Sequence, residues 1–418
     1  MKILWIINTI LPFPSKKIGI TPTVFGGWLN SLLEDLIISE EIKKIAIATV
    51  YSGDILLKFT DKKVVYYLIP CKNKNKYDKN IEKYWQTINE EFKPDKVHIH
   101  GSEFPHSLAY LNACPSSKTL VSIQGLISVC GKKEIYNANL TLNDMLTNIT
   151  IRDIIKNDLL LFQAKQFRNR GKYENEILKK CNTIIGRTSF DNAYSFSITK
   201  ENKYEFCNES LRKSFYLNEW KIEKAEKHSI FISQASYPLK GFHIALKAFN
   251  ELKNIYPDLK VYVAGNDIIK DSKNFKEKLK ISGYGKLIKK LIKKYKLKDN
   301  IEFLGLLNEE EICKRMLNSH VFVQSSSIEN SPNSLGEAML LGLPCVASYA
   351  GGTPDMLLDK KEGFLYQFGD YTMLQKYITD IFENEELAIT LGQNARRHAQ
   401  ITHSKEINTK KMIEIYKK

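Results

Sequence analysis

The sequence predicts an α/β protein with two parallel-sheet domains, and two observations carry that prediction. First, a chain of 418 residues with 43% hydrophobic content is globular in composition and too long for one ordinary hydrophobic core. Second, short apolar segments typical of buried strands alternate with segments of helical period. That alternation indicates βαβ units, whose parallel strands bind ligands at their carboxyl ends.

The first series of strands and helices occupies the first half of the chain. Its expected strands are KILWII, KIAIATV, VVYYLI, KVHIH, TLVSIQ and NTIIG. Helices are expected after Gly27, over about 80–92, and from Thr188, which has Asp191 three residues on. The opening MKILWIINTI resembles a secretion signal, but LPFP and a glycine pair follow it instead of a small-residue cleavage site. We therefore interpret it as a first buried strand.

The second series fills the rest of the chain. Its expected strands are SIFISQ, LKVYVAG, NIEFLG, VFVQS, PCVAS and GFLYQ, and its helices lie at about 241–256, 286–297, 308–317 and 334–341. The charged segment KIEKAEKH, residues 221–228, is the expected linker. It separates an N-terminal domain, 1–220, from a C-terminal domain, 229–395. We expect the helical tail, 396–418, to pack back on the N-terminal domain.

Composition narrows the class of protein. Seven scattered cysteines without a C-x-x-C pair argue against a disulfide framework and a zinc site, and favour a reducing compartment. The net charge of +15 is spread along the chain, and no aromatic-interleaved basic groove indicates nucleic-acid binding. The densest basic segment, 285–300, has the pattern of an amphipathic helix with a lysine-rich outer face. Such a helix either covers a sheet or lies on a membrane surface.

The loop after HVFVQS carries the most specific chemistry. Glu329 and Glu337 stand eight residues apart around an Asn-Ser-Pro-Asn-Ser segment, between an expected strand and an expected helix. A helix N-terminus at the end of a strand offers backbone N–H groups to a phosphate, and carboxylates accept hydrogen bonds from hydroxyls. A nucleotide sugar has both the phosphates and the hydroxyls that such a loop would bind. In the alternative interpretation, Ser334 and Glu337 form only a capping box in the first turn of that helix.

These residues resemble glycosyltransferase family 4, the retaining enzymes of the GT-B fold. The match to that family's E-x7-E signature is carried by Glu329, Asn333, Ser334, Leu335 and Glu337, followed by GLPCVAS and AGGTPDML. The resemblance implies two Rossmann-like domains facing each other across a cleft. It also implies that Glu329 faces the donor sugar, that Glu337 binds the ribose, and that the backbone of 333–335 holds the diphosphate.

Further donor-side residues lie in neighbouring loops. Lys240 in SYPLKG begins a helix, where a cation can neutralise a leaving diphosphate without a metal. The family usually adds an arginine in this loop, but this sequence has Gln234, so the missing charge is either absent or supplied by Arg187 or Arg212. Gly265 and Gly305 end adjacent strands. They either let the backbone approach the base and ribose or are plain strand-end glycines.

The N-terminal domain adds candidates for both substrates, and we count Gly26 and Gly27 among the donor-binding residues. Gly26 and Gly27 open a helix and can approach a phosphate or an acceptor. Strand alternation places His98 and His100 on one face, which leaves a metal conceivable and a structural role for His98 open. The resemblance instead makes His100 a contact to the donor sugar or the acceptor. Glu103 and Gln124 then line the acceptor side.

The predicted activity is retaining transfer of a sugar from a nucleotide-diphospho-sugar, with uridine diphosphate favoured on family frequency, to a glycan or lipid-linked glycan. We expect no metal or other cofactor, surface polysaccharide as the product, and a cytoplasmic location that allows peripheral contact with the inner face of the membrane. Two alternatives stay open: a catalytically silent binding partner, suggested by Gln234, and a nucleotide-sugar epimerase or phosphorylase on the same fold.

Overall fold

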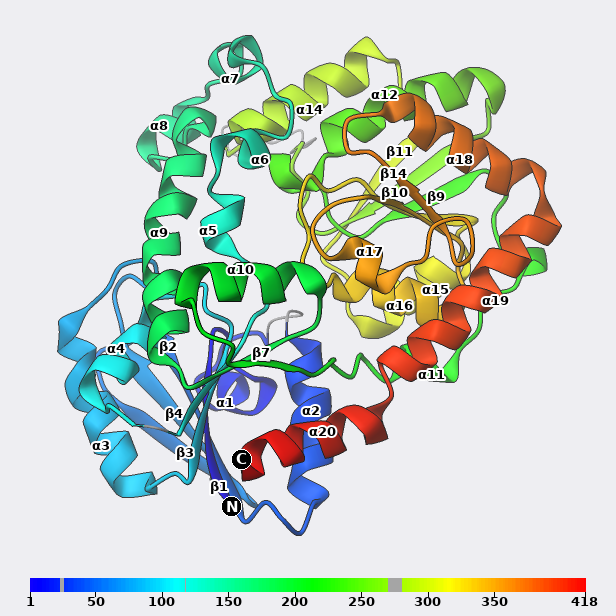
Figure 1. The fold of residues 1–418 in the computed structure, drawn as a ribbon. Helices are drawn as coiled ribbons and strands as arrows, with labels where there is room; N and C mark the ends of the chain where they lie inside the picture. The colour runs from blue at the N-terminus through cyan, green and yellow to red at the C-terminus, as the bar shows by residue number, and fades with distance from the viewer. Residues whose placement is uncertain (23–25, 117, 270–279) are drawn as a thin grey trace. The chain divides into compact units, whose positions relative to one another are not determined.

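The computed structural model describes residues 1–22, 26–116, 118–269 and 280–418 (Figure 1). The chain divides into two compact units. Unit 1 consists of Met1–Val129, Phe167–Leu211 and His403–Lys418, and unit 2 consists of Cys130–Gln166 and Arg212–Thr402. Each unit contains one sheet, so the prediction of two sheet-bearing domains is confirmed.

The sheet of unit 1 has eight strands in the order β3-β4-β2-β1-β5-β6-β7-β8. All neighbours are parallel except β3 and β4. The strands are β1 Lys2–Ile7, β2 Lys44–Tyr51, β3 Leu57–Asp61, β4 Val64–Pro70, β5 Lys96–His100, β6 Thr119–Ser122, β7 Thr183–Gly186 and β8 Tyr204–Phe206.

Strand β1 lies near the centre of this sheet because its sequence is apolar on both faces. Ile3 pairs in register with Ile45 of β2 on one side and with Lys96 of β5 on the other. Its residues from Ile3 to Ile7 are all buried, as expected for a parallel strand covered by helices on both faces. The carboxyl ends of β1, β5 and β6 therefore meet at one edge of the sheet.

The helices of unit 1 include two that it shares with unit 2. They are α1 Pro12–Lys17, α2 Gly27–Ile38, η1 Lys79–Ile81, α3 Glu82–Phe92, α4 His106–Ala113, α10 Ser189–Thr199 and α20 Lys405–Lys417, while α5 Ile127–Cys130 and α9 Leu160–Lys180 cross between the units. Helix α20 packs beside α2, and its Tyr416 is fully buried in the core that contains Trp5. Tyr416 accepts a hydrogen bond from Trp5 Nε1 at 3.1 Å.

The sheet of unit 2 has six parallel strands in the order β11-β10-β9-β12-β13-β14. They are β9 Ser229–Ile232, β10 Lys260–Ala264, β11 Ile301–Gly305, β12 Val321–Gln324, β13 Cys345–Ser348 and β14 Phe364–Tyr366. Every residue of β9, β12 and β13 is buried, and this explains why their sequences are continuous apolar runs.

The helices of unit 2 fall into two groups. Those of its first segment are α6 Lys133–Asn137, α7 Leu142–Thr147 and α8 Ile151–Ile155. Those of its second segment are α11 Ser214–Leu217, η2 Ile222–Lys224, η3 Pro238–Lys240, α12 Phe242–Ile255, α14 Gly283–Lys294, α15 Glu309–Leu317, α16 Asn333–Leu341, α17 Thr353–Met356, α18 Tyr371–Glu383 and α19 Glu385–Thr402. No helix in the described part of the chain is both long and apolar enough to cross a bilayer.

The boundaries between the units differ from the predicted linker at 221–228. That segment lies inside unit 2, where the Glu226 N–H donates to the Asn318 carbonyl at 3.0 Å. Residues 130–166, which we assigned to the N-terminal domain, also belong to unit 2. They are tied there by a 2.7 Å hydrogen bond between His243 Nε2 and the Ala138 carbonyl. Linker composition could not reveal contacts between segments so distant in the chain.

Candidate functional site

The Glu329–Glu337 loop runs from the end of β12 into α16, as the sequence predicted. Helix α16 begins at Asn333, with Pro332 at the N-cap and no side-chain cap. Glu337 is the fifth residue of the helix, not part of its first turn, and Ser334 Oγ accepts a hydrogen bond from Ser233 Oγ at 3.0 Å. The capping-box interpretation of Ser334 and Glu337 is therefore wrong.

Lys240 and Glu329 meet although 89 residues separate them. Lys240 Nζ lies 2.5 Å from Glu329 Oε1, and the same oxygen accepts a 2.6 Å hydrogen bond from Ser326 Oγ. Both side chains are largely buried, with exposed fractions of 20% and 14%. Burial lowers the pKa of Lys240, but the nearby Glu329 carboxylate more than offsets this and raises it overall. Lys240 is therefore a fixed cation.

Two glycines in the left-handed region allow the close backbone contacts around this ion pair. Gly241 has φ +66°, and a Cβ there would lie 1.7 Å from the Ser325 carbonyl oxygen. Gly351 has φ +57°, and its Cβ would lie 1.9 Å from the Glu329 carbonyl oxygen. Neither separation is possible for a side chain, so the loop that carries Glu329 needs glycine at both positions.

Glu337 forms a buried ion pair with Arg212. Arg212 Nε lies 2.6 Å from Glu337 Oε1, and Arg212 Nη2 lies 2.7 Å from Glu337 Oε2. The side chains are 15% and 4% exposed, and this two-bonded geometry is the strong form of an Arg–carboxylate contact. Burial lowers the pKa of Arg212, but the hydrogen bonds and charge of Glu337 raise it overall. Arg212 belongs to unit 2, not to the N-terminal domain as expected.

The remaining donor-side residues follow the ends of β9, β10 and β11. Gly265 and Gly305 both adopt left-handed conformations, with φ of +98° and +76°, and the Gly265 N–H donates to the Gly305 carbonyl at 2.9 Å. Gln234 lies next to Gly265, with its Cγ 3.7 Å from where a Cβ on that glycine would be. The structure thus brings Gln234, Gly265 and Gly305 together at the carboxyl edge of the sheet.

Unit 1 has a cavity of about 710 Å³ at the carboxyl edge of its own sheet. It is lined by four of the residues predicted there, namely Gly26, His100, Glu103 and Gln124. Gly26 is the left-handed N-cap of α2, so the predicted glycine-opened helix is present. The cavity also contains Lys74 and Arg170, and both cations lie over the ring of Phe104, at 4.9 and 4.7 Å from its centroid. No motif marked these two residues.

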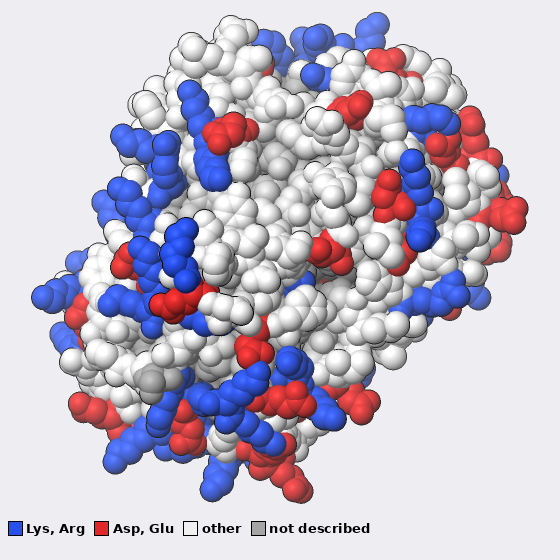
Figure 2. All heavy atoms as spheres, in the orientation of Figure 1, with Lys and Arg blue, Asp and Glu red and all other residues white. Residues whose placement is uncertain are grey.

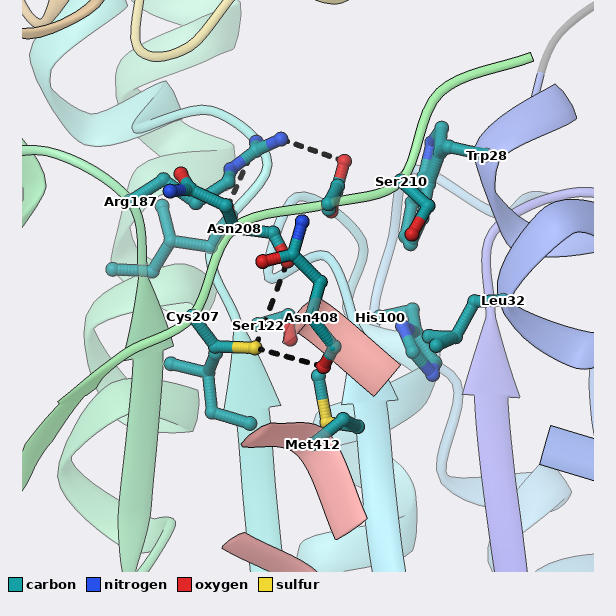
Figure 3. Close-up of a pocket in the computed structure, with 13 residues that line it drawn as sticks. Trp28, Leu32, His100, Ser122, Arg187, Cys207, Asn208, Ser210, Asn408 and Met412 are labelled. Atoms are coloured by element: carbon teal, nitrogen blue, oxygen red, sulfur yellow. Dashed lines mark hydrogen bonds and ion pairs between the residues drawn. The ribbon is translucent and has the colours of Figure 1, made fainter. Parts of the chain in front are cut away.

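His100 ends β5 and is buried between aromatic rings. Its ring centroid lies 3.7 Å from that of His98 and 4.4 Å from that of Trp5. Neither ring nitrogen has a hydrogen-bond partner among the described residues. Burial, reinforced by His98, holds the pKa of His100 well below its usual value, so the ring is neutral. Figure 3 shows His100 beside Leu32, with Trp28 above it and Arg187 across the small adjoining pocket.

His98 has the structural role that the sequence left open. Its Nδ1 lies 2.7 Å from Tyr416 Oη and its Nε2 lies 2.7 Å from Ser122 Oγ. Both nitrogens are therefore engaged, and burial lowers the pKa of His98 to about 3. Within the described ranges, no three His, Cys, Asp or Glu side chains gather as a metal-ligand set.

Glu103 lies in the same cavity as a partly buried carboxyl group. Asn8 Nδ2 donates to its Oε2 at 2.9 Å, and Arg170 Nη2 donates to its backbone carbonyl at 3.1 Å. Burial raises the pKa of Glu103 to about 7, and the charge of Glu174 adds to this. The group can therefore change protonation state near neutral pH.

Arg187, predicted on the donor side, lies in unit 1. Its Nη1 is 2.6 Å from Glu209 Oε2, and Gln124 Nε2 donates to the other oxygen of that carboxylate at 2.5 Å. Arg187 is 6% exposed, and Glu209 balances its charge. In Figure 3 a dashed line marks the ion pair of the Arg187 guanidinium.

Comparison with known proteins agrees with these observations. The model of the family described as glycosyl transferases group 1 matches residues 213–398. Among relatives, the amylovoran biosynthesis glycosyltransferase AmsK of Erwinia amylovora is 27% identical over 144 residues, which cover 32% of this chain and 35% of that protein. The chain aligns with only 28% to 49% of the length of the first curated relatives it matches.

Solved structures match over the full length. Sucrose-phosphate synthase from Thermosynechococcus elongatus superposes with a TM-score of 0.74 at 15% identity, covering 100% of this chain and 98% of that one. Anabaena HepE, solved in complex with UDP and glucose, gives a TM-score of 0.67 at 15% identity, with 99% of each chain covered. The chain thus has the GT-B fold, and its residues 213–398 match the glycosyl transferases group 1 family.

Proposed function

We propose that the protein is a retaining glycosyltransferase that moves a sugar from a nucleotide-diphospho-sugar to a glycan or lipid-linked glycan acceptor. The observation that carries this proposal is the buried Lys240–Glu329 pair beside the uncapped N-terminus of α16. A fixed cation and the positive end of a helix together suit the negative charge that develops on a leaving diphosphate. The relative named for amylovoran biosynthesis supports a surface polysaccharide as the product.

The donor would lie along the carboxyl edge of the unit 2 sheet. In this arrangement the backbone of Asn333–Leu335 binds the diphosphate, and Glu329 accepts hydrogen bonds from the sugar hydroxyls. Glu337 accepts hydrogen bonds from the ribose while Arg212 fixes its orientation and charge. Gly265 and Gly305 leave room for the base. UDP is the favoured nucleotide, because a fold relative was solved with UDP and glucose.

The transfer itself would proceed by attack on the face that the leaving group departs from. Retaining hydrolases instead place two carboxylates about 5 Å apart, one as nucleophile. Glu329 is held by Lys240 and Ser326, and this contact suits positioning better than nucleophilic attack. The leaving phosphate then takes the proton of the acceptor hydroxyl, and Lys240 stabilises the negative charge that remains on the departing diphosphate.

The acceptor would enter the cavity of unit 1. His100 offers a neutral ring whose nitrogens have no partner among the residues described, so it can bind a sugar hydroxyl. Glu103 and Gln124 add polar contacts. Lys74 and Arg170 suit an acceptor with a phosphate or carboxylate group, because both cations line this cavity and lie over the ring of Phe104.

Transfer would require no metal, since Lys240 and the α16 N-terminus supply the positive field. Turnover measured after exhaustive chelation should equal turnover before it. Loss of activity with chelator and its recovery with a divalent cation would refute this part of the proposal.

The decisive experiment measures UDP release from UDP-sugars by Glu329→Ala and Lys240→Ala variants, with Glu310→Ala as the matched control. Glu310 is an exposed glutamate of unit 2 in α15. Each site variant should lose about 100- to 1000-fold in turnover, while the control keeps its activity. The melting temperature of each variant shows whether it is folded. Near-normal turnover in both folded site variants would place the site elsewhere.

A further inference from the structure

Exposed apolar side chains are concentrated in one short part of unit 2. Of the nineteen large hydrophobic residues exposed in the described chain, six lie between residues 142 and 162. They come from α7, α8 and the start of α9, and Ile151, Ile154 and Ile155 are 65%, 64% and 78% exposed. We call them the α7–α9 face: Leu142, Leu146, Ile151, Ile154, Ile155 and Phe162.

This face is held firmly by the buried side of the same helices. Met145 is 4% exposed, and Asp153 is 1% exposed and accepts a 2.7 Å hydrogen bond from the Gly283 N–H at the start of α14. Exposed isoleucines on a loose loop would need no explanation, but here they project from an anchored surface. Ile151, Ile154 and Ile155 stand three and four positions apart on α8 and therefore share one face of that helix. Exposed apolar side chains gathered on an ordered surface mark a candidate interaction site.

The described charges beside the α7–α9 face are mainly positive. Helix α14 contains five lysines and no acidic residue, and Lys286 donates to the carbonyls of Thr147 and Ile149 at 3.2 and 3.3 Å. Two of the carboxylates beside the face, Asp153 and Asp158, are neutralised by Arg152, and Asp144 accepts hydrogen bonds from Thr141 in the capping box of α7. Figure 2 shows the lobe over α7 and α8 as largely uncharged, with Lys and Arg side chains and some acidic side chains at its border.

We propose that the α7–α9 face binds an anionic lipid bilayer. Its isoleucines would enter the boundary between headgroups and acyl chains, and the lysines of α14 would contact the headgroups. This combination also argues against a second copy of the chain as the occupant, because two identical lysine-bordered faces would repel each other. The inference is independent of the donor site, although it would place the protein next to lipid-linked substrates.

Co-sedimentation of the full chain with vesicles of phosphatidylglycerol and phosphatidylethanolamine tests the proposal. Wild type should bind these vesicles and bind weakly to phosphatidylcholine vesicles. The triple variant Ile151→Ser, Ile154→Ser, Ile155→Ser should lose about 1000-fold in partitioning, at roughly tenfold for each of the three apolar side chains withdrawn. The control is Ile38→Ser with Ile401→Ser, which alters residues that are 79% and 69% exposed elsewhere and should bind as wild type does.

A second variant tests the lysines: Lys290→Glu, Lys293→Glu and Lys294→Glu reverse the exposed charge of α14 but leave Lys286 in place. It should lose binding to anionic vesicles, most clearly at low salt. The proposal fails if wild type does not bind anionic vesicles, or if the triple isoleucine variant binds as tightly as its control. It also fails if sedimentation without lipid shows a dimer that the isoleucine variant disrupts, since the face would then be a contact between copies.

Discussion

At the scale of single residues, the Arg212–Glu337 pair makes the first prediction. Replacing Glu337 by Gln should lower the free energy of unfolding by about 3 kcal/mol, because it leaves the Arg212 charge buried without its partner. The double variant Arg212→Met, Glu337→Met should recover much of that loss. Urea denaturation of the two single Met variants and the double variant gives the coupling energy. Additive losses would mean that the two side chains do not depend on each other.

Glu103 makes a second prediction, about pH. Its carboxyl pKa is raised from 4.5 to about 7 in the folded chain, so between these values the folded state holds a proton that the unfolded state has lost. Stability from this group is therefore present at pH 5 and falls as the pH rises through 7. The Glu103→Gln variant cannot titrate at this position. Its melting temperature minus that of wild type should therefore be larger at pH 8 than at pH 5. The same difference at both pH values would contradict the shift.

Sequence reasoning could select candidate residues that have a local signal, but not the partners that only folding supplies. Glu329, Lys240 and His100 could be chosen because each follows an apolar strand or begins a helix. The capping interpretation of Ser334 and Glu337 was wrong because the helix begins at Asn333, so Glu337 falls outside the first turn. Its contact with Arg212, 125 residues away, has no local signal.

At the scale of elements, the glycine after η3 makes a third prediction. Gly241→Ala should destabilise unit 2 by more than 2 kcal/mol, about the upper range for ordinary substitutions, because its Cβ would overlap the Ser325 carbonyl. Gly305→Ala is the matched control, since Gly305 also has a positive φ but has no atom within 4 Å of the added Cβ. Thermal melts of both variants separate steric overlap from backbone strain. Equal losses would show that the overlap is relieved at no cost.

Elements with a strong period were predicted, and those without one were not. The central strands of both sheets are buried over nearly their whole length and rich in apolar residues, so their sequences identified them. Strand β3 is antiparallel with alternating burial, and β8 has three residues with none buried; neither has a continuous apolar run. Helices α5 to α8 have four to six residues each, too short for a helical repeat to be evident.

At the scale of the whole molecule, Tyr416 makes a fourth prediction. Its hydroxyl joins Trp5 and His98, residues 411 and 318 positions away. Tyr416→Phe should cost unit 1 about 1–3 kcal/mol, because the Trp5 N–H is left buried without an acceptor. Tyr371→Phe, which alters a ring that is 37% exposed, should be close to neutral. Denaturation followed by tryptophan fluorescence compares them, and no loss in Tyr416→Phe would show that another group satisfies Trp5.

The division into units also has a consequence for how the protein is made. Unit 1 gathers its parts from three separate stretches of the chain, and unit 2 lies between them in sequence. A ribosome delivers residues in order, and domains usually fold as they emerge. Unit 1 contains the earlier residues but is completed last, because the hydrogen bond of its His98 needs Tyr416 from the end of its third stretch. The early stretch must stay unaggregated while nearly three hundred further residues are added. Slow translation or early termination should therefore harm unit 1 more than unit 2, although unit 1 comes first.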